Sequence, residues 1–457
     1  MTTKSLQEAS DKTGIPVKEL KKLMALTYAK GELPRPIAMK NVGFAKSTIQ
    51  ALRNELDPLL KQARKDAQIT VNHAFRLIIC NLVVSVLSRH RLSLSGRDKD
   101  YTKEATYKKL RFTLRAVNTV TNALIQNRYL VFKKGSKIKQ EVNSYQPTKK
   151  LELLLLPLIY EIQEEYLGDD KHLVIYKPKL EKKAKKKDKL SLVAVNNPQN
   201  LVHSPSQNHT MGRRSYSPEL LPDHPDRAGL KRINEYLKDV TYALKSPVKR
   251  IFSYADPMQG GRLYVRLQGL PDRRARVRIN TLLDGKPVAE VDLSANHPRM
   301  LMALENKKLP ATFYDDIATK TKTTRDQVKF LVTRAIGASD RRISLKPDVE
   351  EKDWYVTDFI LTYPERDAIW SAIESDYPVL YSKFFKGNGI YLQGLEGDIL
   401  MKAMLSLIEQ DIPSLPIHDA IYVQRRHKSK AKKALEKSWM EVLGVNFKPA
   451  IKIDEAA

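Results

Sequence analysis

The sequence has little cysteine, no long apolar run and too few acidic residues to balance its basic ones. Cys80, the only cysteine, lies in the apolar run 77–84, so an internal disulfide and a cysteine-based zinc site are both excluded. No run approaches the roughly 18 apolar residues of a membrane-spanning helix, and the N-terminus has no hydrophobic signal core. We therefore expect a cytoplasmic protein with no membrane partner, and Cys80 as a small core residue.

The charge balance is strongly basic. Lys and Arg number 80 against 52 Asp and Glu among 457 residues, which leaves a formal net charge of +28. An excess spread over much of the chain indicates a polyanionic partner, because neutralising phosphates releases counterions and drives association. Nucleic acid is the expected partner.

The N-terminal half divides into two basic units. Residues 1–70 predict a helical arm, with a turn at 14–16 between two short helices that either enter a DNA groove or belong to a helical bundle. In 71–176, a helix at 107–124 precedes a short strand, a basic turn and a returning strand at 145–148. This order resembles a winged helix, whose wing commonly touches a phosphate backbone. The alternative is a small α+β domain that only packs against its neighbour.

Residues 177–228 predict a basic polar linker. The lysine block at 177–190 repels itself and cannot form a core, and the stretch after it is rich in Asn, Ser, Pro and His. Such a segment can also lie along nucleic acid. Strands and helices alternate over 229–457, which we interpret as the unit that carries the chemistry.

The stretch 287–301 organises this C-terminal unit. Its first seven residues alternate as a strand does, which places Val288, Glu290 and Asp292 on one face, and a polar turn then opens a helix. A carboxylate at the end of a buried strand is costly unless it meets a cation or a metal. We predict that Asp292 binds metal; the alternative is an Asp that caps the next helix.

Two further stretches have residues that favour phosphate binding. The glycine pair 260–261 lets backbone approach a ligand closely, and the arginines of 273–278 can clamp phosphate with two hydrogen bonds. After Thr324, a plausible N-cap, a helix places Arg325 and Lys329 on one face, as binding of a triphosphate would require.

A second carboxylate follows near the C-terminus. The helix at 391–407 is amphipathic, and its expected buried residues are Leu395, Ile399, Ala403 and Leu407. Beyond it, two short apolar runs flank His418 and Asp419, which predicts a tight hairpin with the acid at its tip. Asp419 would then be a carboxylate on a rigid β-edge.

Six pieces, taken in order, resemble the polymerases of the DNA polymerase I class and the single-subunit phage and mitochondrial RNA polymerases. They are Gly261-Arg262-Leu263, Leu267-Gln268-Gly269-Leu270-Pro271, Asp292-Leu293-Ser294 with Arg299, Arg325 with Lys329, Gln393-Gly394, and His418-Asp419. Each piece is short, but six in register are specific. The resemblance covers about 230 to 430.

The resemblance implies a right-hand polymerase of the α+β class, with a palm of antiparallel strands and helical fingers between Asp292 and Asp419. The implied reaction is template-directed nucleotidyl transfer, with DNA synthesis from nucleoside triphosphates on a primed DNA template favoured. Asp292 and Asp419 would hold two Mg²⁺, or Mn²⁺, and Lys329 would donate a proton to pyrophosphate. The residues implied to contact the nucleotide are Arg325, Lys329, His297 and Ile336. Those implied to contact primer or template are Arg262, Gln268, Arg299, Gln393 and His418.

Two departures keep alternatives open. His297 stands where the DNA-synthesising members have Glu and the RNA polymerases a small residue, so the choice of sugar stays open. Ile336-Gly337 stands near the family's Tyr-Gly and lacks the aromatic, which leaves fidelity open. The alternatives are a single-subunit RNA polymerase or primase, and a non-catalytic DNA-binding replication initiator or regulator. Ahead of residue 230 we find no Asp-x-Glu segment in an α/β setting that would support a proofreading exonuclease. A compact polymerase of this kind suits a phage or mobile element in a bacterial cell.

Overall fold

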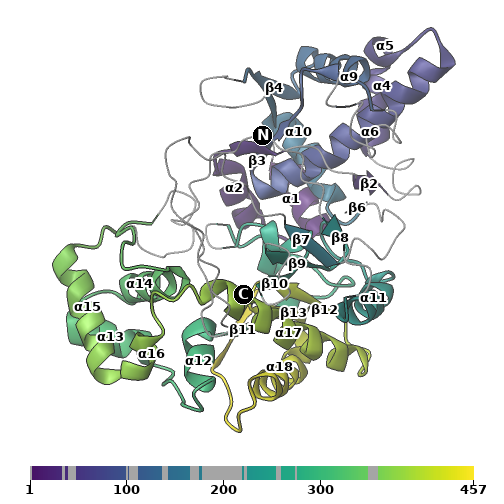
Figure 1. Cartoon of the computed structure of the whole chain (residues 1–457). Coiled ribbons are helices and arrows are strands. Elements are labelled where there is room, and N and C mark those ends of the chain that lie inside the picture. Colours follow the sequence, from purple (N-terminus) through teal and green to yellow (C-terminus); the bar gives the residue numbers. More distant parts are fainter. Residues whose placement is uncertain are drawn as a thin grey trace.

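The computed structural model describes residues 3–32, 37–39, 48–98, 101, 112–135, 143–164, 174–177, 219–220, 224–253, 259–272, 275–347 and 359–456. Over these residues the chain is a mixture of helices and small, mainly antiparallel sheets (Figure 1). The coarse α+β expectation is therefore confirmed.

The N-terminal arm begins as predicted. Helices α1 (Thr3–Thr13) and α2 (Val17–Ala25) flank a turn at Gly14, whose φ of +77° is costly for other residues. The elements that follow are β1 (Ala29–Glu32), β2 (Ile37–Met39), α4 (Thr48–Glu55) and α5 (Asp57–Leu60). The helical arm thus also contributes two strands, which a loose helical pattern did not indicate.

Helix α6 (Lys65–Ser88) is the centre of the N-terminal core. Cys80 on this helix is 1% exposed, as expected of a small core residue. Contrary to the expectation of no long apolar run, α6 is the one helix in the described part of the chain that is long and apolar enough to cross a membrane. However, 72% of its most apolar stretch is buried inside the protein, as in a core helix, because neighbouring elements cover it.

The predicted helix, strand and returning strand are present, and the connecting turn from residue 136 to 142 lies outside the described residues. Helix α9 (Leu114–Gln126) leads into β4 (Leu130–Lys133), which pairs antiparallel with β5 (Ser144–Pro147). Residues 107–111 of the predicted helix belong to the part of the chain left undescribed. With β3 (His90–Ser93), these strands form a sheet of order β1-β3-β5-β4. The unit closes with α10 (Lys149–Leu155), the 3₁₀ turn η1 (Leu156–Leu158) and β6 (Ile162–Glu164).

A second sheet links the two halves. Its order is β10-β9-β7-β8, formed by β10 (Gly260–Tyr264), β9 (Lys249–Ser253), β7 (Val174–Lys177) and β8 (Glu219–Leu220). Most of the predicted linker, 178–218, lies outside the described residues. The linker range 177–228 nevertheless contains β8, which pairs with β7, and the start of α11 (Asp226–Leu237).

The C-terminal sheet is antiparallel throughout, with the order β12-β13-β11-β14. Its strands are β12 (Ser414–Ile417), β13 (Ala420–Gln424), β11 (Val288–Leu293) and β14 (Ile451–Glu455). Both the strand predicted at 287–293 and the hairpin predicted around 418–419 are confirmed. Short 3₁₀ turns accompany the sheets: η3 (Arg266–Gly269), η4 (Arg278–Asn280) and η6 (Arg425–His427).

Helices fill the chain between β11 and β12. They are α12 (Asn296–Ala303), α13 (Phe313–Thr321), α14 (Arg325–Gly337), α15 (Tyr363–Asp376), α16 (Pro378–Ser382) and α17 (Gly389–Ile408). In Figure 1, α13 to α16 form a lobe to one side, whereas α17 and α18 (Lys428–Leu443) lie near the sheet. Thr324 caps α14 in a capping box with Gln327, as its sequence position predicted.

Candidate active site

The fold brings Asp292 and Asp419 together. In the antiparallel pairing of β11 with β13, Asp292 lies opposite Ala420, the residue after Asp419. The Leu293 amide donates a hydrogen bond of 3.3 Å to the Asp419 carbonyl, so the tip of the hairpin is fixed against the end of β11. The two predicted carboxylates, distant in sequence, therefore meet at one end of the two central strands of the sheet.

Asp292 does not cap the helix that follows it. The N-cap of α12 is Ala295, a residue with φ of +50° that has no side-chain cap hydrogen bond. The capping alternative for Asp292 is therefore wrong, since the turn carries the chain too far before the helix begins. Asp292 is half-buried at the end of a strand whose Val291 and Leu293 are fully buried.

Asp419 has an unfavourable electrostatic environment. Burial raises its pKa well above the usual range, and the neighbouring carboxylates of Asp292 and Glu396 raise it further. A bound cation would relieve this repulsion. The described residues contain no group of three or more His, Cys, Asp or Glu side chains arranged to hold a metal. Two carboxylates are nevertheless enough for Mg²⁺, which keeps several waters and completes its shell with substrate phosphates.

Glu396 on α17 is a third carboxylate that the sequence interpretation missed. Its side chain is fully buried and pairs with Arg262, whose Nε lies 2.5 Å from Oε2, while His297 Nε2 lies 3.7 Å from the same oxygen. Burial alone would raise the pKa of Glu396, but Arg262 and His297 outweigh burial and lower that pKa to about 2. The carboxylate therefore stays charged, and it fixes two residues that were predicted to contact the substrates.

A second layer of side chains supports Glu396. Asn296 donates to Glu396 Oε1 at 3.5 Å, and the Trp439 indole donates to the Asn296 oxygen at 3.3 Å. A signal for Glu396 existed in the sequence. It lies at helical spacing from Leu392 and Ile399, so an acid falls on the buried face of α17.

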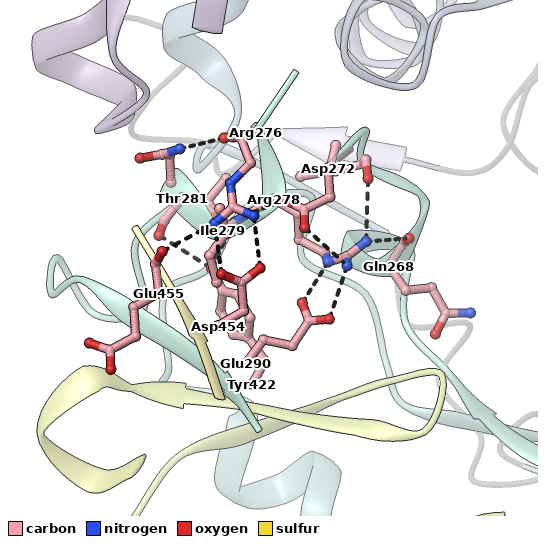
Figure 2. Close-up of polar contacts among 12 residues, drawn as sticks. Gln268, Asp272, Arg276, Arg278, Ile279, Thr281, Glu290, Tyr422, Asp454 and Glu455 are labelled. Atoms are coloured by element: carbon pink, nitrogen blue, oxygen red, sulfur yellow. Dashed lines mark hydrogen bonds and ion pairs between the residues drawn. The ribbon is translucent and has the colours of Figure 1, made fainter. Parts of the chain in front are cut away.

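His418 at the hairpin tip is held neutral. Burial lowers its pKa, and the guanidinium groups of Arg278 and Arg262 lower it further, to about 4. The residue adopts a φ of +54°, which the two-residue turn requires. Arg278 itself forms a two-bonded ion pair with Glu290, at 3.0 and 3.1 Å (Figure 2).

The arginines at 276 and 278 have internal partners. Arg276 binds both carboxylate oxygens of Asp454, at 2.8 and 2.9 Å, as Figure 2 shows beside the Arg278 pair with Glu290. The expectation that these two clamp a phosphate is therefore wrong in this structure, because protein carboxylates occupy the same guanidinium atoms. Arg273 and Arg274 lie outside the described residues.

The glycine pair meets protein backbone instead of a ligand. Gly260 and Gly261 have φ values of +80° and +87°. A Cβ atom on Gly397 of α17 would lie 2.0 Å from the Gly261 carbonyl oxygen, so α17 contacts β10 at backbone distance. The close approach was predicted correctly, but its partner is α17.

Arg250 on β9 stabilises this contact, and the sequence interpretation missed it. The side chain is 2% exposed and donates to the carbonyls of Gly261 at 2.8 Å and Gly394 at 3.1 Å. It also pairs with Asp226 at 2.6 Å and Asp398 at 2.7 Å. One buried cation thus joins β10, α11 and α17.

Helix α14 presents Arg325 and Lys329 on its outer side. Arg325 is exposed, lies 3.5 Å from Asp315 and stacks over the ring of Tyr314, whereas Lys329 is half-buried. Ile336 on the same helix is 1% exposed and belongs to the core. It lies two helical turns beyond Lys329 on the same face of α14, at a point where the core covers that face.

The remaining residues predicted to contact primer or template differ in how exposed their side chains are and in whether they bind protein backbone. Arg299 is 6% exposed and donates to the backbone carbonyls of Ser294, Leu309 and Pro310, so it stabilises the chain around α12. Gln393 is half-buried on α17. Gln268 is half-buried as well, and its Oε1 accepts no hydrogen bond within the part of the chain that the structure describes.

We compared the chain with known protein families and with curated proteins, and neither comparison gave a match. The evidence for function therefore comes from the geometry of these residues and from the order of the motifs.

Proposed function

We propose that this protein is a template-directed nucleotidyltransferase, and most specifically a DNA polymerase. In this proposal the sheet β12-β13-β11-β14 is the palm and helices α13 to α16 are the fingers. The observation that carries the proposal is the meeting of Asp292 and Asp419 at one end of the two central strands of an antiparallel sheet. The order of the six motifs supports it independently.

The two carboxylates fit a site for Mg²⁺. Held by Asp292 and Asp419, two Mg²⁺ would lower the pKa of the primer 3′-hydroxyl and neutralise charge on the leaving pyrophosphate. The 3′-hydroxyl would lose its proton to solvent as its oxygen attacks the α-phosphorus, and the bond from that phosphorus to the oxygen bridging the α- and β-phosphates would break. The pyrophosphate that leaves takes a proton from Lys329.

The outer face of α14 supports binding of the triphosphate. Arg325 and Lys329 lie one helical turn apart there, and the only carboxylate recorded beside Arg325 in the described part of the chain is the exposed Asp315, at 3.5 Å. An exposed pair of this kind contributes little, so a phosphate can replace Asp315 at small cost. The buried Ile336 would act by supporting the helix, without touching the nucleotide.

Glu396 supports a role for Arg262 and His297 near the reacting groups. A buried carboxylate that pairs with both residues limits their rotamers, which is how a rigid site is built. His297 can donate a hydrogen bond to a ribose 2′-hydroxyl or obstruct it. Separate tests with deoxynucleotides and ribonucleotides distinguish a DNA polymerase from an RNA polymerase or primase.

The first experiment is primer extension by the full chain on a primed DNA template with Mg²⁺, offering dNTPs and NTPs separately. Asp292→Asn and Asp419→Asn keep the side-chain shapes and remove the charges, and we expect each to slow extension at least about 100-fold. Asp239→Asn, a surface carboxylate, is the matched control and should extend at the wild-type rate.

Extension that persists in both variants would contradict the proposed site. Absence of extension by the wild type with either nucleotide set, despite binding of the duplex, would favour the second candidate, a non-catalytic DNA-binding protein. The observation that favours this candidate is the confirmed helix and hairpin of the N-terminal unit.

A further inference from the structure

Helix α9 has one buried face and one exposed face, and its exposed residues are all Asn, Gln or Arg. The exposed side chains on α9 are Arg115, Asn118, Asn122 and Gln126. At 3.6 residues per turn these four fall within an arc of about 80°. The opposite side packs into the core through Val117, Val120 and Leu124. The helix therefore offers a stripe of amide and guanidinium groups to the outside.

The residue types on this stripe are those that recognise base edges. The amide of Asn or Gln can donate to and accept from adenine at once, and Arg can donate twice to guanine. Lys and Glu, the usual residues of a merely solvated helix face, do not occur on α9. A stripe selected only for solubility would be expected to contain them.

The sequence around α9 is cationic. Residues 105–140 contain nine Lys and Arg residues and no Asp or Glu. Arg128 lies two residues after the end of the helix, and Lys133 and Lys134 are exposed where β4 ends. Phosphate contacts from such positions fix a protein on a duplex, while base contacts supply the specificity.

The position of α9 leaves the stripe accessible. In Figure 1 the helix lies at the end of the molecule remote from β11, beside β4. Its buried face is fixed by the N-terminal core, with Thr113 capping the first turn through the Ala116 amide. A helix held along one side and exposed along the other can enter a groove as a rigid body.

We propose that α9 is a base-reading helix that binds the major groove of double-stranded DNA. The major groove of B-form DNA admits an α-helix, whereas that of duplex RNA is too deep and narrow. An apolar protein partner would require apolar side chains on the stripe. This inference does not depend on the proposed catalytic function, because it concerns only the N-terminal unit.

The test is selection by the full-length protein from a pool of DNA duplexes with a random centre two helical turns long. We expect enrichment of one sequence motif. The variant Asn118→Ala/Asn122→Ala should lose about 5- to 150-fold in affinity for that motif for each adenine contact removed. Its affinity for random duplex should stay unchanged, because the cations remain.

The matched control is Gln7→Ala/Gln410→Ala, which removes two exposed amides on other parts of the surface. It should keep both the motif and the affinity. Three outcomes would each overturn the proposal: no enriched motif, an unchanged motif and affinity in the α9 variant, or equal binding of an RNA duplex. Primer extension by the same preparations reports separately on the proposed catalytic function.

Discussion

Two arginines show how differently one residue type is used here. Arg276 makes two hydrogen bonds to Asp454, whereas Arg325 is exposed, lies 3.5 Å from Asp315 and stacks over the Tyr314 ring. A phosphate must displace a two-bonded carboxylate from Arg276, which costs more than displacing the exposed partner of Arg325. Availability for a ligand is therefore decided by the partner of each side chain.

His418 makes stability depend on pH. Its pKa is about 4 in the folded protein and near 6.5 when unfolded. As the pH falls from 7 to 5, the unfolded chain takes up a proton that folded His418 does not, so the free energy of unfolding decreases. We expect the wild type to lose about 2 kcal/mol more than His418→Asn over this interval.

Urea unfolding at pH 7 and at pH 5 measures this difference. Asn is chosen because it tolerates the positive φ of position 418. If both proteins lose the same free energy of unfolding between pH 7 and pH 5, His418 is not held neutral in the folded protein.

At the scale of elements, the contact of α17 with β10 positions the site. It places Glu396 beside Arg262, and it depends on the absence of a side chain at Gly397. The amphipathic pattern correctly predicted Ile399, Ala403 and Leu407, which are fully buried, whereas Leu395 is only partly buried against the core. It could not predict the neighbour on that face, because periodicity carries no information about partners.

Gly397→Ala tests this contact. The new Cβ would lie 2.0 Å from the Gly261 carbonyl oxygen, which is backbone and cannot rotate away. We expect a loss of about 3 kcal/mol in the free energy of unfolding. Gly337→Ala, near the end of α14, is the control: its Cβ meets nothing within 4 Å, so its stability should change little or rise. If Gly397→Ala unfolds with the same free energy as the wild type, α17 can shift away from β10 without cost.

At the scale of the whole molecule, the two halves share one hydrophobic core. Tyr160 joins them: its hydroxyl accepts from the Leu282 amide at 2.8 Å and donates to the Thr13 carbonyl at 2.7 Å. Nearby, the Arg276 amide donates to Glu19 at 3.0 Å. DNA held by the N-terminal half would therefore have a defined orientation relative to β11.

Tyr160→Phe should weaken this connection. The Leu282 amide then loses its acceptor at a partly buried site, which costs about 1–3 kcal/mol locally. We expect faster hydrogen exchange at the peptide that contains Leu282, measured by mass spectrometry. Tyr363→Phe, which removes an exposed hydroxyl on α15, should leave this exchange unchanged. Equal exchange in Tyr160→Phe and the wild type would mean that other contacts hold the halves together.

The sequence by itself determined the local elements: the strand that carries Asp292, the capped helix with Arg325, and the hairpin at His418 and Asp419. These depend on alternation, capping and turn chemistry, which act between near neighbours. Tertiary structure alone decided the roles of Glu396, Arg250 and Arg276, and the choice of α17 as the partner of the glycine pair. A buried charge is stabilised by a counter-charge from a distant segment, and only the folded chain fixes which segment that is.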